Sequence, residues 1–299
     1  MDVSGDMRNE GVSGPHAGRE GLRIVGLNAF LPGFRLVHEF VERNGHELVL
    51  VVTLPETGRY GENPPMVAGL PDDTTVLITR KLRAVAAPVI DALRPDVIIS
   101  AAFPRLIPPE ILEIPKYGAI NCHPSPLPAG RGPTPQRLIY EGYEHVAATV
   151  HRTAAEFDTG AILAQRIAPL PDDLNGTAIM GVWRDLLTEC LDEAVPRLVS
   201  GDPGTPQDPA AASDAPFFTD AERLLDLTEP AHVVRRKAAA LNVTAPSAKV
   251  HLAGATHLIT RTDVVPPGTT TRSDPGAILE EHEDGWTVQT GDLPLRLTR

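Results

Sequence analysis

The sequence predicts an α/β fold, an open and mostly parallel Rossmann-like sheet with helices on both faces, followed by a small C-terminal β-barrel. Short β-rich runs alternate with segments of helical spacing over about the first 200 residues. The runs are almost continuously apolar, which is typical of strands covered on both faces. After residue 249, short strand-like runs are separated by Pro-Gly and Asp-Gly turns, which indicates the barrel.

The predicted strands and helices of the first part follow one another in βα order. Strands are expected at 22–27, 46–54, 75–78, 96–102, 119–123, 145–153 and 161–168. Helices are expected between Phe34 and Gly45 and at 82–93, 136–143 and 177–199. Open sheets of this class bind ligands beyond the carboxyl ends of their strands. Because His123 ends one of these strands, we expect a ligand site beside it.

Changes in composition predict four parts. The parts are a polar, disordered leader (1–21), a large α/β domain (22–200), a Pro/Ala/Asp-rich linker (201–217) and a C-terminal domain (218–299). The leader lacks the apolar core of a signal peptide. Within the C-terminal domain, residues 221–241 are helical in character, interrupted at Pro230.

Composition argues against several classes of protein. The chain of 299 residues is 42% hydrophobic and 22% charged, as in soluble globular proteins, and no apolar run of about 18 residues could span a membrane. Cys122 and Cys190 form no CxxC pair, so we expect a reducing cytoplasm and no disulfide framework. The net charge of −12 would repel a nucleic-acid backbone. Neither the GxGxxG nor the P-loop nucleotide fingerprint is present.

Polar side chains suited to catalysis lie at the end of the fifth predicted strand. Because alternate residues of a strand share a face, Asn121 and His123 lie together and Cys122 points away. Asp158 lies in a later Asp-Thr-Gly turn. When an amine attacks an acyl carbon, amide and imidazole N–H groups can stabilise the oxyanion, and a carboxylate or imidazole can take the proton. The three side chains therefore suit acyl transfer to an amine.

Each residue also has a simpler interpretation. Asp158 alone is a common turn residue, and His123 alone could be a hydrogen-bonded core histidine. A two-histidine, one-carboxylate metal site from His123, His151 and Asp158 is an alternative, but no tight spacing such as HExxH supports it, and we predict no metal. Ser125 lacks the GxSxG turn of a serine nucleophile.

The motifs also resemble the formyltransferases that use 10-formyltetrahydrofolate, whose hallmark is Asn-x-His, a Ser-x-Leu-Pro loop and a distant Asp-x-Gly. The corresponding residues here are Asn121-Cys122-His123, Ser125-Pro126-Leu127-Pro128 and Asp158-Thr159-Gly160. The similarity runs from about residue 22 to 199. The two-domain layout resembles that of methionyl-tRNA formyltransferases, whose C-terminal domain is an OB-like barrel.

The resemblance implies that Asn121, His123 and Asp158 are catalytic, with Asn121 and His123 donating to the carbonyl and Asp158 handling the proton. It implies 10-formyltetrahydrofolate as co-substrate and a cis Leu127–Pro128 bond. The pterin would be held mostly by backbone contacts from loops 103–107 and 154–158. The residues expected to contact folate are Phe103, Leu106, Ile107, Glu156 and Phe157.

The amine acceptor stays open at this point. Loop 55–73 has Arg59 against four carboxylates, and from Thr205 onward nine Lys/Arg face thirteen Asp/Glu, a net charge of −4. This charge disfavours tRNA, although methionyl-tRNA stays a candidate beside a small-molecule amine such as an amino sugar, an amino acid or a natural-product intermediate. His151, seven residues before Asp158, resembles glycinamide ribonucleotide formyltransferases. Hydrolysis of the folate donor and a non-catalytic folate-binding or interaction module are alternatives, and the oligomeric state is not predicted.

Overall fold

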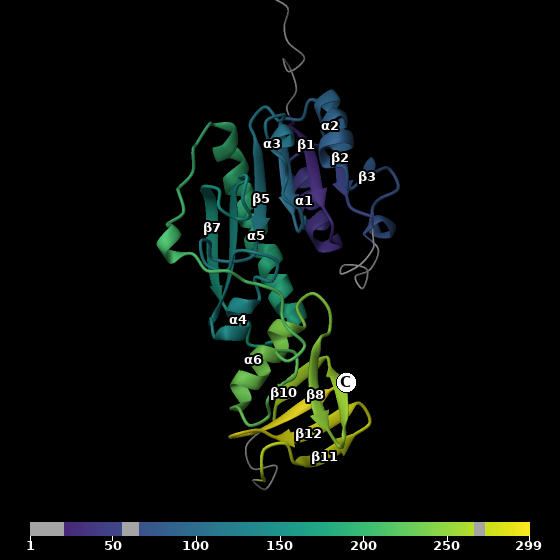
Figure 1. Ribbon diagram of the computed structural model, residues 1–299, viewed down its shortest axis with the longest axis vertical. Helices are drawn as coiled ribbons and strands as arrows, with labels where there is room; N and C mark the ends of the chain where they lie inside the picture. The colour runs from purple at the N-terminus through teal and green to yellow at the C-terminus, as the bar shows by residue number, and fades with distance from the viewer. Residues whose placement is uncertain (1–20, 56–65, 266–272) are drawn as a thin grey trace, which may run out of the picture.

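The computed structural model describes residues 21–55, 66–265 and 273–299 (Figure 1). Residues 1–20 of the predicted leader and residues 56–65 of the predicted loop 55–73 lie outside these ranges. Figure 1 shows two lobes, a large one built on a sheet and a small one that holds the C-terminal strands. Among the described residues, no helix is long and apolar enough to cross a membrane.

The large lobe is built on a seven-stranded sheet in the order β3-β2-β1-β4-β5-β6-β7. The strands are β1 (Arg23–Asn28), β2 (Glu47–Thr53), β3 (Val76–Ile78), β4 (Val97–Ala101), β5 (Ala119–His123), β6 (His145–Arg152) and β7 (Ile162–Pro169). Strands β1 to β5 are parallel, whereas β6 and β7 run antiparallel to their neighbours. The predicted open, mostly parallel sheet is confirmed.

Helices cover both faces of this sheet, as predicted. One face packs against α1 (Leu31–Arg43) and α5 (Gly176–Val199), and the other against η2 (Leu82–Ala86), α2 (Ala87–Leu93) and α3 (Pro109–Leu112). Cys122 and Cys190 are both buried free thiols in the cluster on the α1 and α5 face. Cys122 therefore points away from the face of its neighbours Asn121 and His123, as the strand alternation predicts.

The small lobe contains α6 (Ala231–Leu241) and antiparallel strands. The strands are β8 (Ala248–Leu252), β9 (Ala255–Ile259), β10 (Arg261–Val264), β11 (Ile278–His282), β12 (Gly285–Gln289) and β13 (Pro294–Thr298). Strands β10-β13-β12-β11 form one sheet and β8-β9 a hairpin. Val234 and Leu241 of α6 pack with Trp286 and Val288 in one core. This antiparallel C-terminal region was expected from the turn pattern.

The predicted helical character of residues 221–229 is wrong. The N–H of Leu225 donates to the carbonyl of Lys249 at 2.8 Å, and the N–H of Lys249 donates to the carbonyl of Arg223 at 2.7 Å. These backbone groups extend the β8 pairing and are not available to a helix. Asp226 also accepts the N–H of Thr228, and such local side-chain bonds compete with helix formation.

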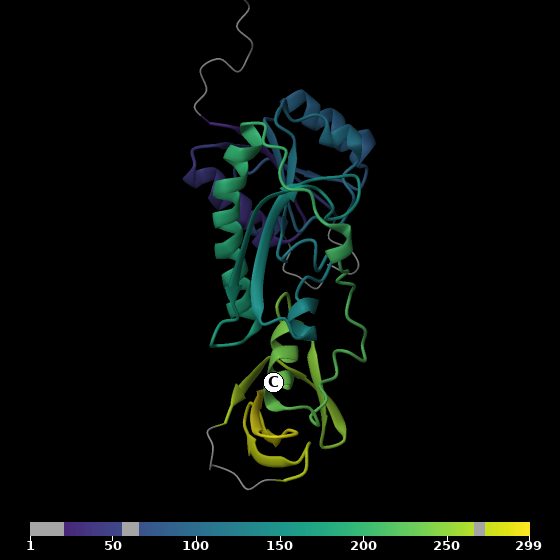
Figure 2. The same cartoon turned by 90° about the vertical axis from the view of Figure 1, so that its left-hand side faces the viewer.

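The segment expected to be a linker packs against the large lobe. The backbone of Thr205 pairs with Ile162 of β7 through two bonds of 2.8 Å, and Arg131 pairs with Ser213 and Ala215 farther along. Between these contacts lies the short helix η3 (Pro209–Ala211). Figures 1 and 2 show this stretch running from the end of α5 along the large lobe to α6. It therefore adds a layer to the large lobe before it enters the small one.

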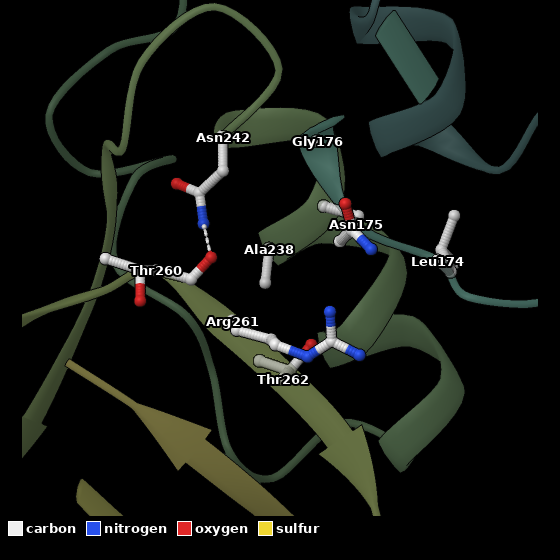
Figure 3. Close-up of a pocket in the computed structure, with 9 residues that line it drawn as sticks. Leu174, Asn175, Gly176, Ala238, Asn242, Thr260, Arg261 and Thr262 are labelled. Atoms are coloured by element: carbon white, nitrogen blue, oxygen red, sulfur yellow. Dashed lines mark hydrogen bonds between the residues drawn. The ribbon is translucent and has the colours of Figure 1, made fainter. Parts of the chain in front are cut away.

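The two lobes also meet at the start of α5. Figure 3 shows Asn175 and Gly176 beside Asn242 at the end of α6, with Arg261 of β10 nearby. A Cβ atom at Gly176 would lie 2.2 Å from the carbonyl oxygen of Asn242, so this close approach needs glycine. The crevice leaves essentially no space for even a water-sized molecule, whereas ligand pockets enclose roughly 300–1,000 Å³. We interpret it as a packing seam.

Arg137 of α4 (Arg137–Glu141) is the main polar contact between the lobes. Its side chain is buried and donates to Glu222 at 2.8 Å, and to the carbonyls of Pro216 at 2.9 Å and Phe217 at 3.2 Å. Its guanidinium also lies over the ring of Phe218. One side chain thus fixes the chain where it passes from one lobe to the other.

We predict that Arg137→Ala destabilises the protein by about 2 kcal/mol, because two backbone carbonyls and a partly buried carboxylate lose their donor. The measurement is thermal unfolding by calorimetry. The matched control is Arg184→Ala, because Arg184 pairs with Asp185 on the exposed surface and should change stability by less than about 0.5 kcal/mol. Equal effects of the two variants would contradict the interlobe role of Arg137.

Candidate active site

The register of β5 and β6 places four polar side chains on one face of the sheet. Asn121 lies opposite His151, and His123 lies opposite Thr149. Directly opposed residues of an antiparallel pair point to the same side. The amide nitrogen of Asn121 is accordingly 3.1 Å from Nε2 of His151. The shared face expected for Asn121 and His123 thus also includes His151.

Asp158 lies at the centre of this group. Its Oδ1 is 3.2 Å from Nδ2 of Asn121, 3.6 Å from Nδ1 of His123 and 3.6 Å from Nε2 of His151. Its Oδ2 accepts the N–H of Gly132 at 2.9 Å. One carboxylate oxygen is therefore anchored to the proline-rich loop after β5, while the other faces the polar cluster. The structure brings the three expected residues together.

The turn that carries Asp158 has an unusual backbone. Asp158 has a φ of 56°, in the left-handed region that residues with a side chain rarely adopt. Two residues later, a Cβ atom at Gly160 would lie 1.7 Å from the carbonyl oxygen of Arg152, so no other residue fits. Surrounding contacts must hold such a backbone in place. The Asp-Thr-Gly motif is thus a condition for the position of the carboxylate.

The cluster separates the charges of its members. Burial alone would raise the pKa of the Asp158 carboxyl, but the positive charge of His123 when it is protonated, the contact with His151 and the Gly132 N–H outweigh it and lower that pKa to about 2. Burial lowers the pKa of His123, and the charge of Asp158 offsets this only in part. At neutral pH the site therefore pairs an ionised Asp158 with a neutral His123.

The hydrogen-bond donors of the cluster already have protein acceptors. A carbonyl only accepts, so Nε2 of His123 carries a proton and donates to Gly130 at 2.8 Å, and Nδ1 of His151 donates to Arg152 at 2.8 Å. Nε2 of His151 is then free to accept from the amide of Asn121. The other N–H of that amide points at Asp158. An oxyanion would have to take over one of these donors.

The residues expected to contact folate divide into two groups. Phe103 and Ile107 are buried in the core under β4 and hold their loop in place. Leu106 is 49% exposed, Phe157 is 50% exposed, and Glu156 is exposed as well. Among the five, the last three can present side chains to a ligand. The Leu127–Pro128 peptide bond is cis, as expected.

Two other chemistries lack the arrangement they need. Ser125 is buried, and within the described ranges its hydroxyl has no hydrogen-bond partner, so no base activates it as a nucleophile. The described residues also contain no cluster of His, Cys, Asp or Glu suited to a metal ion.

Gln207 also belongs to the site, although no sequence motif indicates it. Its side-chain amide donates to the carbonyls of Asp158 and Gly160, both at 2.8 Å, and its oxygen accepts two bonds from Arg131 at 2.7 and 3.2 Å. A glutamine in a Pro/Ala-rich stretch carries no sequence signal for such a role. Only the folding of residues 205–215 onto the large lobe brings it to the site.

Comparisons with known proteins identify the family of this chain. A model described as formyl transferase matches residues 61–194, and one described as formyl transferase, C-terminal domain, matches residues 218–299. The chain belongs to the formyltransferase family. Methionyl-tRNA formyltransferase of Bacillus licheniformis is 34% identical over 269 residues, which is 85% of this formyltransferase and 83% of the relative.

Solved structures show the same fold. HypX from Aquifex aeolicus, in complex with tetrahydrofolic acid, has a TM-score of 0.68 at 21% identity and covers 92% of this formyltransferase, which spans only 43% of HypX. The sugar 3N-formyl transferase WlaRD, in the presence of dTDP and 5-N-formyl-THF, has a TM-score of 0.63 at 13% identity and covers 94% of this chain and 98% of its own. At these identities the likeness concerns the fold.

We predict that His123 titrates below its ordinary value of 6.5 and that Asp158→Asn lowers its pKa further, since the carboxylate charge favours the imidazolium. Nitrogen NMR of the imidazole against pH measures this. Asp208→Asn, which removes an exposed carboxylate near the site in sequence, should leave the titration unchanged. A rise of the His123 pKa in Asp158→Asn would contradict the charge assignment.

Proposed function

We propose that this formyltransferase moves a formyl group from 10-formyltetrahydrofolate to the primary amine of a small molecule. The observation that carries the chemistry is the cluster of half-buried Asn121 with buried His123 and Asp158, in which one Asp158 oxygen faces both other residues. An amide, a neutral imidazole and a carboxylate are the groups that direct acyl transfer to an amine requires. No protein nucleophile is involved.

In the reaction, a bond forms between the amine nitrogen and the formyl carbon, and the bond from that carbon to N10 of folate breaks. The amine loses one proton and N10 gains one. An Asp158 carboxyl with a pKa of about 2 is a weak base, so Nδ1 of His123 is the better acceptor, and the Asp158 charge stabilises the imidazolium. His123 then returns the proton to N10. This proposal moves the proton from Asp158, where the family resemblance placed it, to His123.

Asn121 supplies the oxyanion donor in this proposal. Its N–H now lies 3.2 Å from Oδ1 of Asp158. When His123 becomes an imidazolium, the charge on Asp158 is shared with it, and the Asn121 N–H can turn to the developing negative oxygen. His151 holds the second N–H of the same amide and so keeps its orientation.

The residues present fit a folate. Leu106 and Phe157 expose apolar side chains on the two loops that the family resemblance assigns to the pterin. Exposed apolar side chains near a polar cluster are a common feature of ligand sites. The structural neighbours HypX and WlaRD, solved with folates, support the same donor.

The charge of the small lobe supports a small-molecule acceptor. Phosphate backbones bind through cations that are free to exchange counterions. In the small lobe, several cations are instead paired with acidic residues of the chain. These pairs include Lys237–Glu229 at 2.6 Å, Arg261–Asp173 at 2.7 Å and Arg296–Asp284. With a net charge of −12 over the whole chain, little positive potential is left to attract a nucleic acid.

Methionyl-tRNA is the second candidate acceptor. The observation that favours it is the similarity to methionyl-tRNA formyltransferase, which covers both parts of the chain and 83% of the relative. The small lobe, which such a relative shares, has no part in the proposed chemistry.

The deciding experiment measures release of tetrahydrofolate from 10-formyltetrahydrofolate with a panel of amino sugars and amino acids, and separately with methionyl initiator tRNA. We expect amine-dependent turnover with the small molecules. Turnover on tRNA alone would replace the small-molecule proposal. Turnover that persists without any amine would identify a hydrolase, and folate binding without turnover would identify a non-catalytic module.

We predict that Asn121→Ala, His123→Ala and Asp158→Ala each lower the rate of formyl transfer by about 100-fold or more, with folding retained. The rate is followed as release of tetrahydrofolate, and folding by circular dichroism. Ser125→Ala is the control from the same loop and should stay within about twofold of wild type, because the proposed chemistry uses no serine. Near-normal turnover by His123→Ala would remove the central claim.

A further inference from the structure

We infer that Gln207 is a positioning residue that holds the Asp158 carboxylate in its reactive place, and that segment 205–215 is part of the active site. The inference rests on the proposed function for its activity readout. It concerns a residue in the stretch whose composition predicts a linker, away from the sequence motifs of the site.

Gln207 holds the strained backbone turn that carries Asp158. Asp158 has a φ of 56°, in the left-handed region that strains a residue with a side chain. The two N–H groups of Gln207 donate to the carbonyls of Asp158 and Gly160, both at 2.8 Å, and so clamp the turn from both sides of Thr159. Without these bonds, the turn can relax and carry the carboxylate away from Asn121 and His123.

Gln207 also joins the two loops of the site, the Asp158 turn and the loop after β5. Its Oε1 accepts two bonds from the guanidinium of Arg131, next to Gly132, whose N–H binds Oδ2 of Asp158. One amide thus links the Asp158 turn to the loop after β5. The two loops are thereby held together at the Asp158 carboxylate.

The segment that carries Gln207 is anchored to the large lobe on both sides of this residue. On one side of it, Thr205 pairs with Ile162 at 2.8 Å in both directions. On the other side, the hydroxyl of Ser213 accepts the N–H of Gly130 at 3.0 Å, and the N–H of Ala215 donates to the carbonyl of Arg131 at 2.6 Å. Because this segment is fixed on both sides of Gln207, the Gln207 side chain can hold the Asp158 turn in place.

The test uses Gln207→Ala and Gln207→Glu in the full-length protein. Glutamate keeps an acceptor for Arg131 but cannot donate to two carbonyls. We expect both variants to lower kcat by about tenfold, while KM for 10-formyltetrahydrofolate stays within about threefold. Asp220→Asn, which removes an exposed carboxylate outside this segment, should match wild type. Recovery of kcat in Gln207→Glu would show that holding Arg131 is what matters and would overturn the inference.

Two further readouts separate positioning from general stability. In an Asp158→Asn background, Gln207→Ala should lower kcat by less than about twofold more, because the two residues act through one group. The His123 pKa, measured by nitrogen NMR, should shift in Gln207→Ala toward its value in Asp158→Asn. Independent, multiplicative losses or an unchanged His123 titration would overturn the inference. Because the titration needs no substrate, it decides the role of Gln207 even if wild type transfers formyl to none of the amines.

Discussion

The buried Asp158 carboxylate is the group on which the site depends. One of its oxygens is anchored by the Gly132 N–H, and the other faces an amide and two imidazoles within 3.6 Å. An ionised carboxylate at such a position is stable only where these neighbours compensate its burial. Burial also keeps His123 neutral at neutral pH, and the Asp158 charge opposes this only in part. Stability and chemistry therefore draw on one set of contacts.

Three separate parts of the chain supply this environment. The antiparallel pairing of β5 with β6 sets Asn121 beside His151. The loop after β5 contributes Gly132, and the segment from 205 to 215 contributes Gln207. The last of these runs between the two lobes, so the path of the chain into the small lobe and the position of the carboxylate are coupled. The small lobe is thereby tied to the site through the backbone, whatever acceptor it serves.

The acceptor is where relatives and electrostatics differ. The relative from Bacillus licheniformis is named for its acceptor, methionyl-tRNA. In this chain, however, several cations of the small lobe are paired with acidic residues, and the net charge is −12. Identity of about one third preserves a fold and a catalytic cluster more readily than a charged surface, because the cluster needs particular atoms and the surface only an average potential. A change of acceptor with unchanged formyl chemistry is consistent with both observations.

The sequence by itself determined the sheet, the helices on both faces and the trio of Asn121, His123 and Asp158, because apolar periodicity and short motifs are local properties. It could not predict that 221–229 would pair with β8 and not form a helix, since that depends on a distant strand. Likewise, only the tertiary structure decided the left-handed turn at Asp158 and its support by Gln207. Hydrogen bonds between residues 49 positions apart leave no periodic trace in a sequence.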